Sequence, residues 1–194
     1  MEGRFQFGYC IRMAGPSQCG KTSSLCKLLE SKSFFYPCPP KRIMWVTGSR
    51  TKDEKLEAKI TRLYPNSQFF YDVSKDDDFS DMVEEFDLWV FDDLSSEFKK
   101  NSSFTNFFTK IAHHKNCLMV YLTQNAYEDG PDATTRARNC AYQIFFSNKS
   151  DQRFIRVLGD QLINDAKTFS RMFDKATKRP YDCLLCDNRV STPK

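Results

Sequence analysis

The chain has 194 residues, of which 40% are hydrophobic, 14% aromatic and 28% charged, and its net charge at pH 7 is +4. We expect a single α/β domain over residues 1–194, because a chain of this length buries roughly 70% of its unfolded surface in one core. The sequence contains no apolar run of membrane-spanning length and no signal-peptide core, so we expect an intracellular protein with no membrane contact. The small positive charge permits contact with a polyanion but does not require it.

The first half of the chain alternates between strand-like apolar runs and helical patterns. In chain order we expect a strand over 7–14, a helix beginning near Lys21 and covering 23–31, a strand over 42–47, a helix over 51–63, a strand over 68–73, a helix over 79–86 and a strand over 88–91. Prolines between 37 and 40 prevent the first helix from continuing into the second strand.

The second half continues the alternation. We expect a helix over 104–114, strands over 117–122 and 141–146, helices over 151–164 and 166–176, and a last strand over 181–186. Strands alternating with helices are typical of a mostly parallel central sheet with helices on both faces. The predicted fold class is therefore α/β.

The segment between the first strand and the first helix carries the motif G-x-x-x-x-G-K-[ST], as Gly15-Pro-Ser-Gln-Cys-Gly-Lys-Thr22. Its glycines let backbone amides converge on phosphate oxygens, and the following helix adds its N-terminal dipole. A lysine supplies charge to the β- and γ-phosphates, and a threonine hydroxyl can ligate Mg²⁺. This motif predicts a P-loop NTPase that binds ATP and Mg²⁺, although a glycine-bearing turn before an ordinary helix is the simpler alternative. The predicted nucleotide-binding residues are Gly15, Pro16, Ser17, Gln18, Cys19, Gly20, Lys21, Thr22 and Ser23.

Two acids end the apolar strand at 88–91. In open α/β sheets ligands bind at the carboxyl ends of the strands, where the phosphate loop also lies. We expect Asp92 to hold Mg²⁺ with Thr22, and Asp93 to orient or deprotonate the attacking water. Strands also end in aspartate at ordinary turns, so the two acids predict a metal and water site only in combination with the phosphate loop.

The strand at 117–122 ends in Thr123, Gln124 and Asn125. An amide at this edge could distinguish a nucleoside triphosphate from a diphosphate. Gln124 is the preferred candidate because its side chain is longer; a strand entering an asparagine-containing turn is the alternative.

Arg136 and Arg138 precede the strand at 141–146. A guanidinium can meet the charge that develops on the γ-phosphate, including from a neighbouring subunit. Two other roles are equally compatible with these arginines, namely solvated surface charge and contact with a nucleic-acid phosphate backbone.

The eight cysteines are scattered, and one of them, Cys19, lies inside the phosphate loop. A disulfide there would distort the loop, so we expect a reducing compartment. Cys183 and Cys186 form the one C-x-x-C pair, for which we favour two small buried thiols in a strand over a zinc site.

Taken together, these blocks resemble the viral genome-packaging ATPases of the FtsK/HerA superfamily, in particular the short poxvirus A32-like forms. The resemblance covers 15–187 and includes the phosphate loop, 91–94, 107–114, 121–125, 148–151 and 180–187. It implies an ATP-driven motor that moves viral double-stranded DNA into a capsid, with Lys21, Thr22, Asp92, Asp93 and Gln124 at the aligned positions. Many relatives in the superfamily carry Asp-Glu where this chain, like the A32-like group, has Asp-Asp, and the side chain of Asp93 is shorter than glutamate by one methylene.

The resemblance also implies a homo-oligomeric ring, a capsid or portal partner, and a place of action in the host cell where virions assemble. The candidate DNA contacts are Lys99-Lys100, Arg136-Arg138 and Lys178-Arg179, each of which is more simply a solvated charged face. Three alternatives remain open: a helicase-like or partition ATPase, an ATP-gated assembly scaffold, and a small-molecule kinase. The kinase would need an arginine-rich lid and an acceptor pocket, which the sequence does not indicate.

Overall fold

The structure is a computed structural model, and it describes residues 4–73, 77–94, 107, 114–126, 139–148 and 153–190. Within these ranges no helix combines the length and apolar character that crossing a membrane requires.

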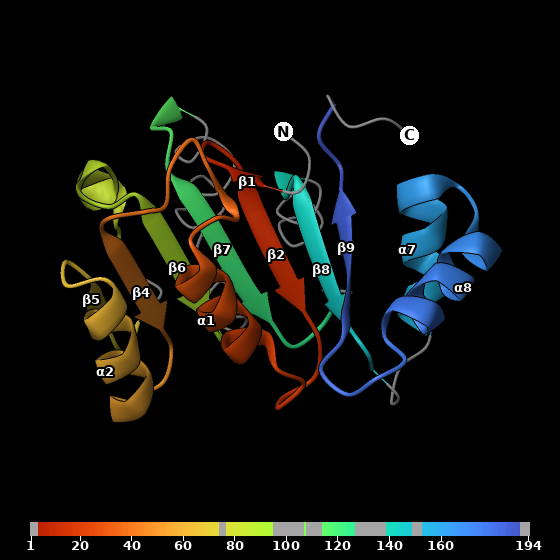
Figure 1. Cartoon of the computed structure of the whole chain (residues 1–194), viewed down its shortest axis with the longest axis horizontal. Coiled ribbons are helices and arrows are strands. Elements are labelled where there is room, and N and C mark those ends of the chain that lie inside the picture. The colour runs from red at the N-terminus through yellow and green to blue at the C-terminus, as the bar shows by residue number, and fades with distance from the viewer. Residues whose placement is uncertain are drawn as a thin grey trace.

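A seven-stranded sheet forms the centre of the molecule, in the order β5-β4-β6-β7-β2-β8-β9 (Figure 1). Neighbouring strands run parallel from β5 to β8, and only β9 is antiparallel to its neighbour. The strands are β2 (Cys10–Ala14), β4 (Ile43–Thr47), β5 (Gln68–Phe70), β6 (Leu88–Asp92), β7 (Leu118–Thr123), β8 (Tyr142–Phe146) and β9 (Cys183–Asp187). The prediction of a mostly parallel sheet is confirmed.

A separate two-stranded sheet, β1 (Phe5–Gln6) with β3 (Phe35–Tyr36), was not predicted. The expected strand over 7–14 is wrong in its first part, because Gly8 adopts φ +82° in a turn that separates β1 from β2. A left-handed residue ends strand geometry at that point. The central sheet therefore begins at Cys10.

The helices follow the predicted order. They are α1 (Lys21–Ser31), α2 (Glu54–Leu63), α7 (Arg153–Ile163) and α8 (Ala166–Ala176), with a 3-10 helix η1 (Ser80–Glu85) at the position predicted as helix 79–86. Asp53 caps α2 by accepting a hydrogen bond from the Leu56 amide, and Asp165 caps α8 through the Thr168 amide. The helix expected over 104–114 lies outside the described residues, apart from Phe107 and His114.

Apolar side chains cover both faces of the sheet because successive strand residues point to opposite sides. On one face Ile11 and Met13 pack with Leu25 and Leu29 of α1. On the other face Trp89 and Phe91 of β6 pack with the buried Phe107 and with side chains of η1. Helices α7 and α8 cover the Ala14 and Phe145 region of that second face. The prediction of helices on both faces is confirmed.

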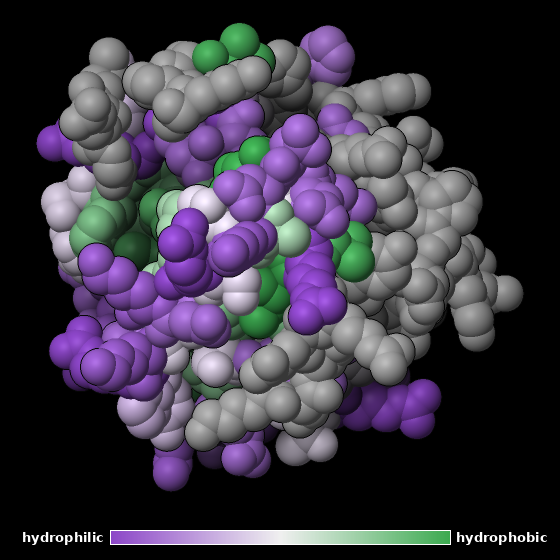
Figure 2. All heavy atoms as spheres, turned by 90° about the vertical axis from the view of Figure 1, so that its right-hand side faces the viewer, coloured by the Kyte–Doolittle hydropathy of each residue, from purple (hydrophilic) through white to green (hydrophobic). Residues whose placement is uncertain are grey.

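Helices α7 and α8 form the end of the molecule beside β9 (Figures 1 and 2). Figure 2 shows that hydrophilic side chains dominate the coloured part of this face, with apolar groups between them. The turn that leaves α8 returns to the edge of the sheet where the phosphate loop lies (Figure 1). The carboxyl ends of the parallel strands and the start of β9 therefore meet at one edge.

Candidate functional site

The predicted phosphate loop joins β2 to α1 at the carboxyl edge of the sheet. The Gly15 amide donates to the Thr123 carbonyl (3.1 Å), which ties the start of the loop to the end of β7. A β-carbon at Gly15 would lie 2.7 Å from Cβ of Phe146 and 2.8 Å from Sγ of Cys19, so this position has no room for a side chain. Gly20, immediately before α1, has φ +101°, a conformation that glycine adopts without strain. Both glycines of the motif are thus required by the backbone and its packing.

Lys21 folds back over the loop. Its Nζ donates to the carbonyl oxygens of Gly15 (2.6 Å) and Pro16 (2.9 Å) and lies 3.9 Å from Sγ of Cys19. The ammonium therefore lies on the inner side of the turn that the loop makes, which is where a phosphate-binding lysine is needed. Burial raises the pKa of the Cys19 thiol, and the Lys21 charge opposes that shift.

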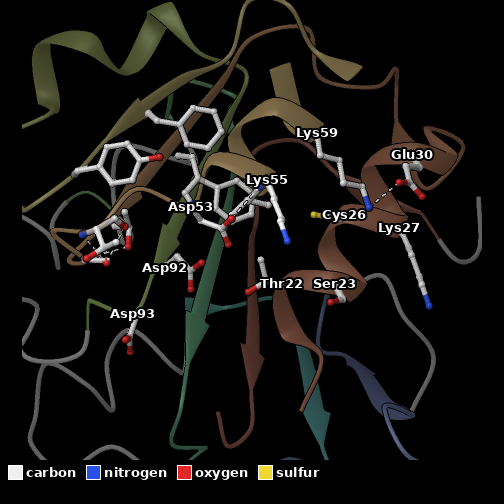
Figure 3. A pocket seen from close by; sticks show the side chains of 17 residues that line it. Thr22, Ser23, Cys26, Lys27, Glu30, Asp53, Lys55, Lys59, Asp92 and Asp93 are labelled. Carbon is white, nitrogen blue, oxygen red and sulfur yellow. Dashed lines mark hydrogen bonds and ion pairs between the residues drawn. The ribbon is translucent and has the colours of Figure 1, made fainter. Parts of the chain in front are cut away.

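A pocket of about 700 Å³ opens beside the first turn of α1. Thr22 and Asp92 face one another at one end of it, with Asp93 further along the same edge (Figure 3). From there the pocket extends between α1 and α2 as far as the ion pair of Lys59 with Glu30 (2.8 Å). The sequence did not indicate this hollow.

Asp92 is a partly buried carboxyl group at the end of β6. Burial, together with the neighbouring charge of Asp93, raises its pKa from 3.8 to about 6, although the charge of Lys21 and a hydrogen bond with the Trp45 side chain act in the opposite direction. A carboxylate that is desolvated and repelled by a second acid is stabilised when a cation binds beside it. A cation bound here would therefore lower the free energy of the ionised Asp92 carboxylate.

We expect Asp92→Asn to stabilise the nucleotide-free protein at pH 7.5. The folded state holds the Asp92 proton more tightly than the unfolded state does, so the wild-type protein loses stability as the pH rises from about 4 to about 6. Converting the pKa difference gives at most about 3 kcal/mol. Thermal unfolding at pH 4, 5, 6 and 7.5 measures the effect, and the gain from the substitution should vanish near pH 4.

The matched control is Asp160→Asn, which removes an exposed carboxylate from α7. As an exposed surface substitution, it should leave the melting temperature at pH 7.5 close to that of the wild-type protein. If Asp92→Asn gave the same melting temperature as the wild-type protein at pH 7.5, Asp92 would not be a strained carboxylate.

Asp93 and Gln124 meet directly. Strand β7 lies between β2 and β6, so the residue that follows β7 emerges between the phosphate loop and the two acids. Nε2 of Gln124 donates to Oδ1 of Asp93 at 2.9 Å. Asp93 has φ +55°, and this left-handed turn redirects the chain immediately after Asp92. The structure thus brings the three predicted residues together at one edge.

Arg12 is a site residue that sequence reasoning missed. It is a buried arginine in the middle of β2, and its Nη2 donates to the carbonyl oxygens of Asn125 (3.1 Å) and Ala126. These contacts hold the segment that follows Gln124 against the strand that carries the phosphate loop. The only signal in the sequence was one charged residue within an otherwise apolar strand.

Other predicted residues lie elsewhere or outside the described ranges. Arg136, Arg138 and Lys99-Lys100 fall outside the described residues, whereas Ser23 lines the pocket. Lys178-Arg179 lies in the turn after α8, where Nε of Arg179 pairs with Asp182 at 2.9 Å.

All eight cysteines, each of which the structure describes, are free thiols. Cys183 packs with the core on the α1 face of the sheet and Cys186 with the core on the α7–α8 face. The two thiols of the C-x-x-C pair therefore do not converge on one metal ion. Among the residues that the structure describes, no three His, Cys, Asp or Glu side chains group together as a metal site.

The chain has the α/β fold of the P-loop NTPases. It is similar to the genome packaging NTPase B204 of Sulfolobus turreted icosahedral virus 2 in complex with AMP, with a TM-score of 0.62 and 15% identity over 100% of this chain and 98% of that one. It is also similar to B204, the DNA-packaging ATPase of Sulfolobus turreted icosahedral virus, with a TM-score of 0.63 and 12% sequence identity over 94% of each chain. A third similar structure is the flagellar accessory protein FlaH of Methanocaldococcus jannaschii, with a TM-score of 0.51 and 18% sequence identity over 77% of each chain. No protein-family model and no curated protein matches the sequence significantly.

Proposed function

We propose that this protein hydrolyses ATP and uses the energy to move viral double-stranded DNA into a capsid. The observation that carries the hydrolytic part is the hydrogen bond between Gln124 and Asp93 beside the phosphate loop. The packaging part is supported by similarity over nearly the whole chain to B204, a genome packaging NTPase. The resemblance of the sequence blocks to the poxvirus A32-like ATPases supports the same assignment.

The phosphate chain of ATP binds in the loop 15–22. Backbone amides and the N-terminus of α1 meet the phosphate oxygens, and Lys21 exchanges the carbonyl oxygens of Gly15 and Pro16 for the β- and γ-phosphates. The exchange replaces two neutral acceptors by charged ones, which strengthens each hydrogen bond. Binding should therefore release Lys21 from its contacts within the loop.

Thr22 and Asp92 are the residues that would hold Mg²⁺. They face one another across the end of the pocket, and hydroxyl and carboxylate oxygens are the ligands that Mg²⁺ prefers. The raised pKa of Asp92 is a second observation in favour, because a cation would offset the repulsion from Asp93. When bound, Mg²⁺ neutralises charge on the β- and γ-phosphates.

Asp93 orients or deprotonates the attacking water in this proposal. It lies beyond Asp92 on the same edge, and Gln124 fixes one of its carboxylate oxygens. The contact also connects Asp93 to β7, whose neighbouring strand β2 carries the phosphate loop. Loss of the γ-phosphate would thereby be sensed at Gln124.

The proposed motor is a homo-oligomeric ring that acts with a capsid or portal protein where virions assemble in the host cell. Arg136 and Arg138 remain the candidates for a finger arginine acting on the nucleotide of a neighbouring subunit. Of the proposed DNA contacts, Lys178 and Arg179 line a hollow together with Tyr181, whose ring packs against Gly20 of the phosphate loop.

The test measures the rate of ATP hydrolysis with and without duplex DNA, together with the mass of the oligomer in solution. We expect duplex DNA to increase the rate without being unwound, and the increase to fall as salt weakens phosphate contacts. The matched control is the same assay on Asp93→Asn, in which DNA binding is retained and hydrolysis is lost. Unwinding of the duplex would favour a helicase-like ATPase, and binding of ATP without turnover would favour an assembly scaffold.

The 700 Å³ pocket bears on the kinase alternative, because it places a hollow beside the γ-phosphate end of the site. Product analysis separates the two activities. An ATPase releases one inorganic phosphate for each ATP consumed without any added acceptor. A kinase would consume ATP only when a phosphate acceptor is supplied.

A further inference from the structure

The geometry points to Tyr181 as the platform on which the nucleotide base stacks. This inference rests on the proposed function, since it requires ATP in the phosphate loop. Tyr181 lies at the start of the segment leading into β9, with 70% of its surface exposed. Its ring nevertheless packs against the loop, because Cδ1 lies 3.1 Å from the position that a β-carbon on Gly20 would occupy. Tyr181 therefore borders the phosphate site.

The backbone holds Tyr181 in a conformation that tyrosine rarely adopts. The Asp182 amide donates to the Arg179 carbonyl at 3.2 Å, which closes a four-residue turn with Pro180 and Tyr181 at its centre. Proline followed by a residue with positive φ is the pattern of a type II turn, which favours glycine or asparagine at the second central position. Tyr181 occupies that position with φ +69°. The ion pair of Arg179 with Asp182 braces the turn.

Strain of this kind is retained where a side chain is needed in one place. Neither the core nor the ion pair needs an aromatic ring at this position, because the ring is mostly exposed and Arg179 pairs with Asp182 without it. What the strained turn achieves is to set the ring of Tyr181 against Gly20. A flat apolar surface beside a phosphate-binding loop suits a nucleobase, since every base has a π-face.

Tyr181 and the two acids lie on opposite sides of the phosphate loop in the strand order of the sheet. Asp92 and Asp93 lie on the β6 side of the phosphate loop, where metal and water are needed at the terminal phosphate. The other end of the nucleotide must therefore extend toward β8 and β9. Strand β9 is antiparallel to β8, with Cys183 opposite Phe146, so the segment that precedes β9 lies at the carboxyl edge of the sheet. Tyr181 is placed where the base would emerge.

A second hollow, of about 520 Å³, lies at this point. Tyr181 lines it together with Lys175, Lys178 and Arg179. The lysines give this hollow a positive charge that suits an anionic nucleotide, and the ring suits the base. Stacking alone does not select one base, so this subsite should accept both ATP and GTP.

The test compares Tyr181→Asn with Tyr181→Phe by calorimetric titration with ATP, GTP and inorganic tripolyphosphate. Asparagine accepts the left-handed backbone but lacks the ring, whereas phenylalanine keeps the ring. Tyr181→Asn should weaken the binding of ATP and GTP about tenfold and leave the affinity for tripolyphosphate unchanged. Tyr181→Phe should bind all three ligands like the wild-type protein. The melting temperature of Tyr181→Asn should be no lower than that of the wild-type protein.

Two results would overturn the inference while leaving the phosphate site intact. One is an unchanged affinity of Tyr181→Asn for ATP, and the other is an equal loss for ATP and tripolyphosphate, which would make Tyr181 a support of the loop. A wild-type protein that binds neither ATP nor tripolyphosphate would instead contradict the proposed function itself, and the base subsite with it.

Discussion

Lys21→Ala is expected to abolish ATP hydrolysis and to weaken ATP binding by about 10²-fold or more, because it removes two charge-assisted hydrogen bonds to phosphate. The reason lies in the position of Nζ, which contacts the carbonyl oxygens of Gly15 and Pro16 at the start of the loop. Calorimetric titration with ATP and a phosphate-release assay measure the two effects.

Lys27→Ala is the matched control, since Lys27 belongs to the same helix and lines the pocket at an exposed position. It should change ATP affinity by less than about threefold, as expected of an exposed charge. Because Lys21 also holds the loop together, the unfolding temperature of Lys21→Ala must be compared with that of the wild-type protein. A folded Lys21→Ala variant that still hydrolyses ATP would contradict the assignment of residues 15–22 as a phosphate-binding loop.

The order of elements could be predicted from the sequence because the apolar runs are short, bounded by turn residues and separated by helical patterns. The errors arose where single residues override such patterns. Gly8 breaks an apolar run with a left-handed turn, and Tyr181 does so in a segment predicted as strand. The strand predicted over 181–186 therefore begins only at Cys183. Tyrosine has no preference for a left-handed turn, so the sequence carried no local signal of this one.

The candidate site was predictable where one motif spans it and unpredictable where distant segments meet. The phosphate loop is contiguous, and the acids follow an apolar strand. The contact of Arg12 with the carbonyl oxygens of Asn125 and Ala126 depends on β2 and β7 being neighbours, which the spacing along the chain does not reveal. The same holds for Tyr181 and Gly20, which are brought together by an antiparallel last strand.

The second large effect is expected for Asp93→Asn, which should bind Mg²⁺ and ATP yet hydrolyse ATP about 10²-fold or more slowly. Asparagine accepts the left-handed backbone at this position, where φ is +55°, and its Oδ1 can still accept the hydrogen bond from Gln124. The substitution therefore removes the charge and the basicity with little change in shape. It also lowers the pKa of Asp92 by removing a repulsive neighbour, so metal binding should be preserved.

The matched partner is Gln124→Ala, which removes the other end of the 2.9 Å hydrogen bond. The double variant combines Asp93→Asn with Gln124→Ala. If Gln124 acts by orienting Asp93, this double variant should hydrolyse ATP no more slowly than Asp93→Asn alone, because residues that act as one unit give non-additive effects. Additive losses would assign Gln124 a separate contact with the γ-phosphate. Loss of nucleotide binding in Asp93→Asn would make Asp93 a metal ligand. Nucleotide binding and single-turnover ATP hydrolysis, measured on the two single variants and the double variant, distinguish these outcomes. Only a non-additive loss of hydrolysis would show that Asp93 and Gln124 act as one water-activating pair between β6 and β7.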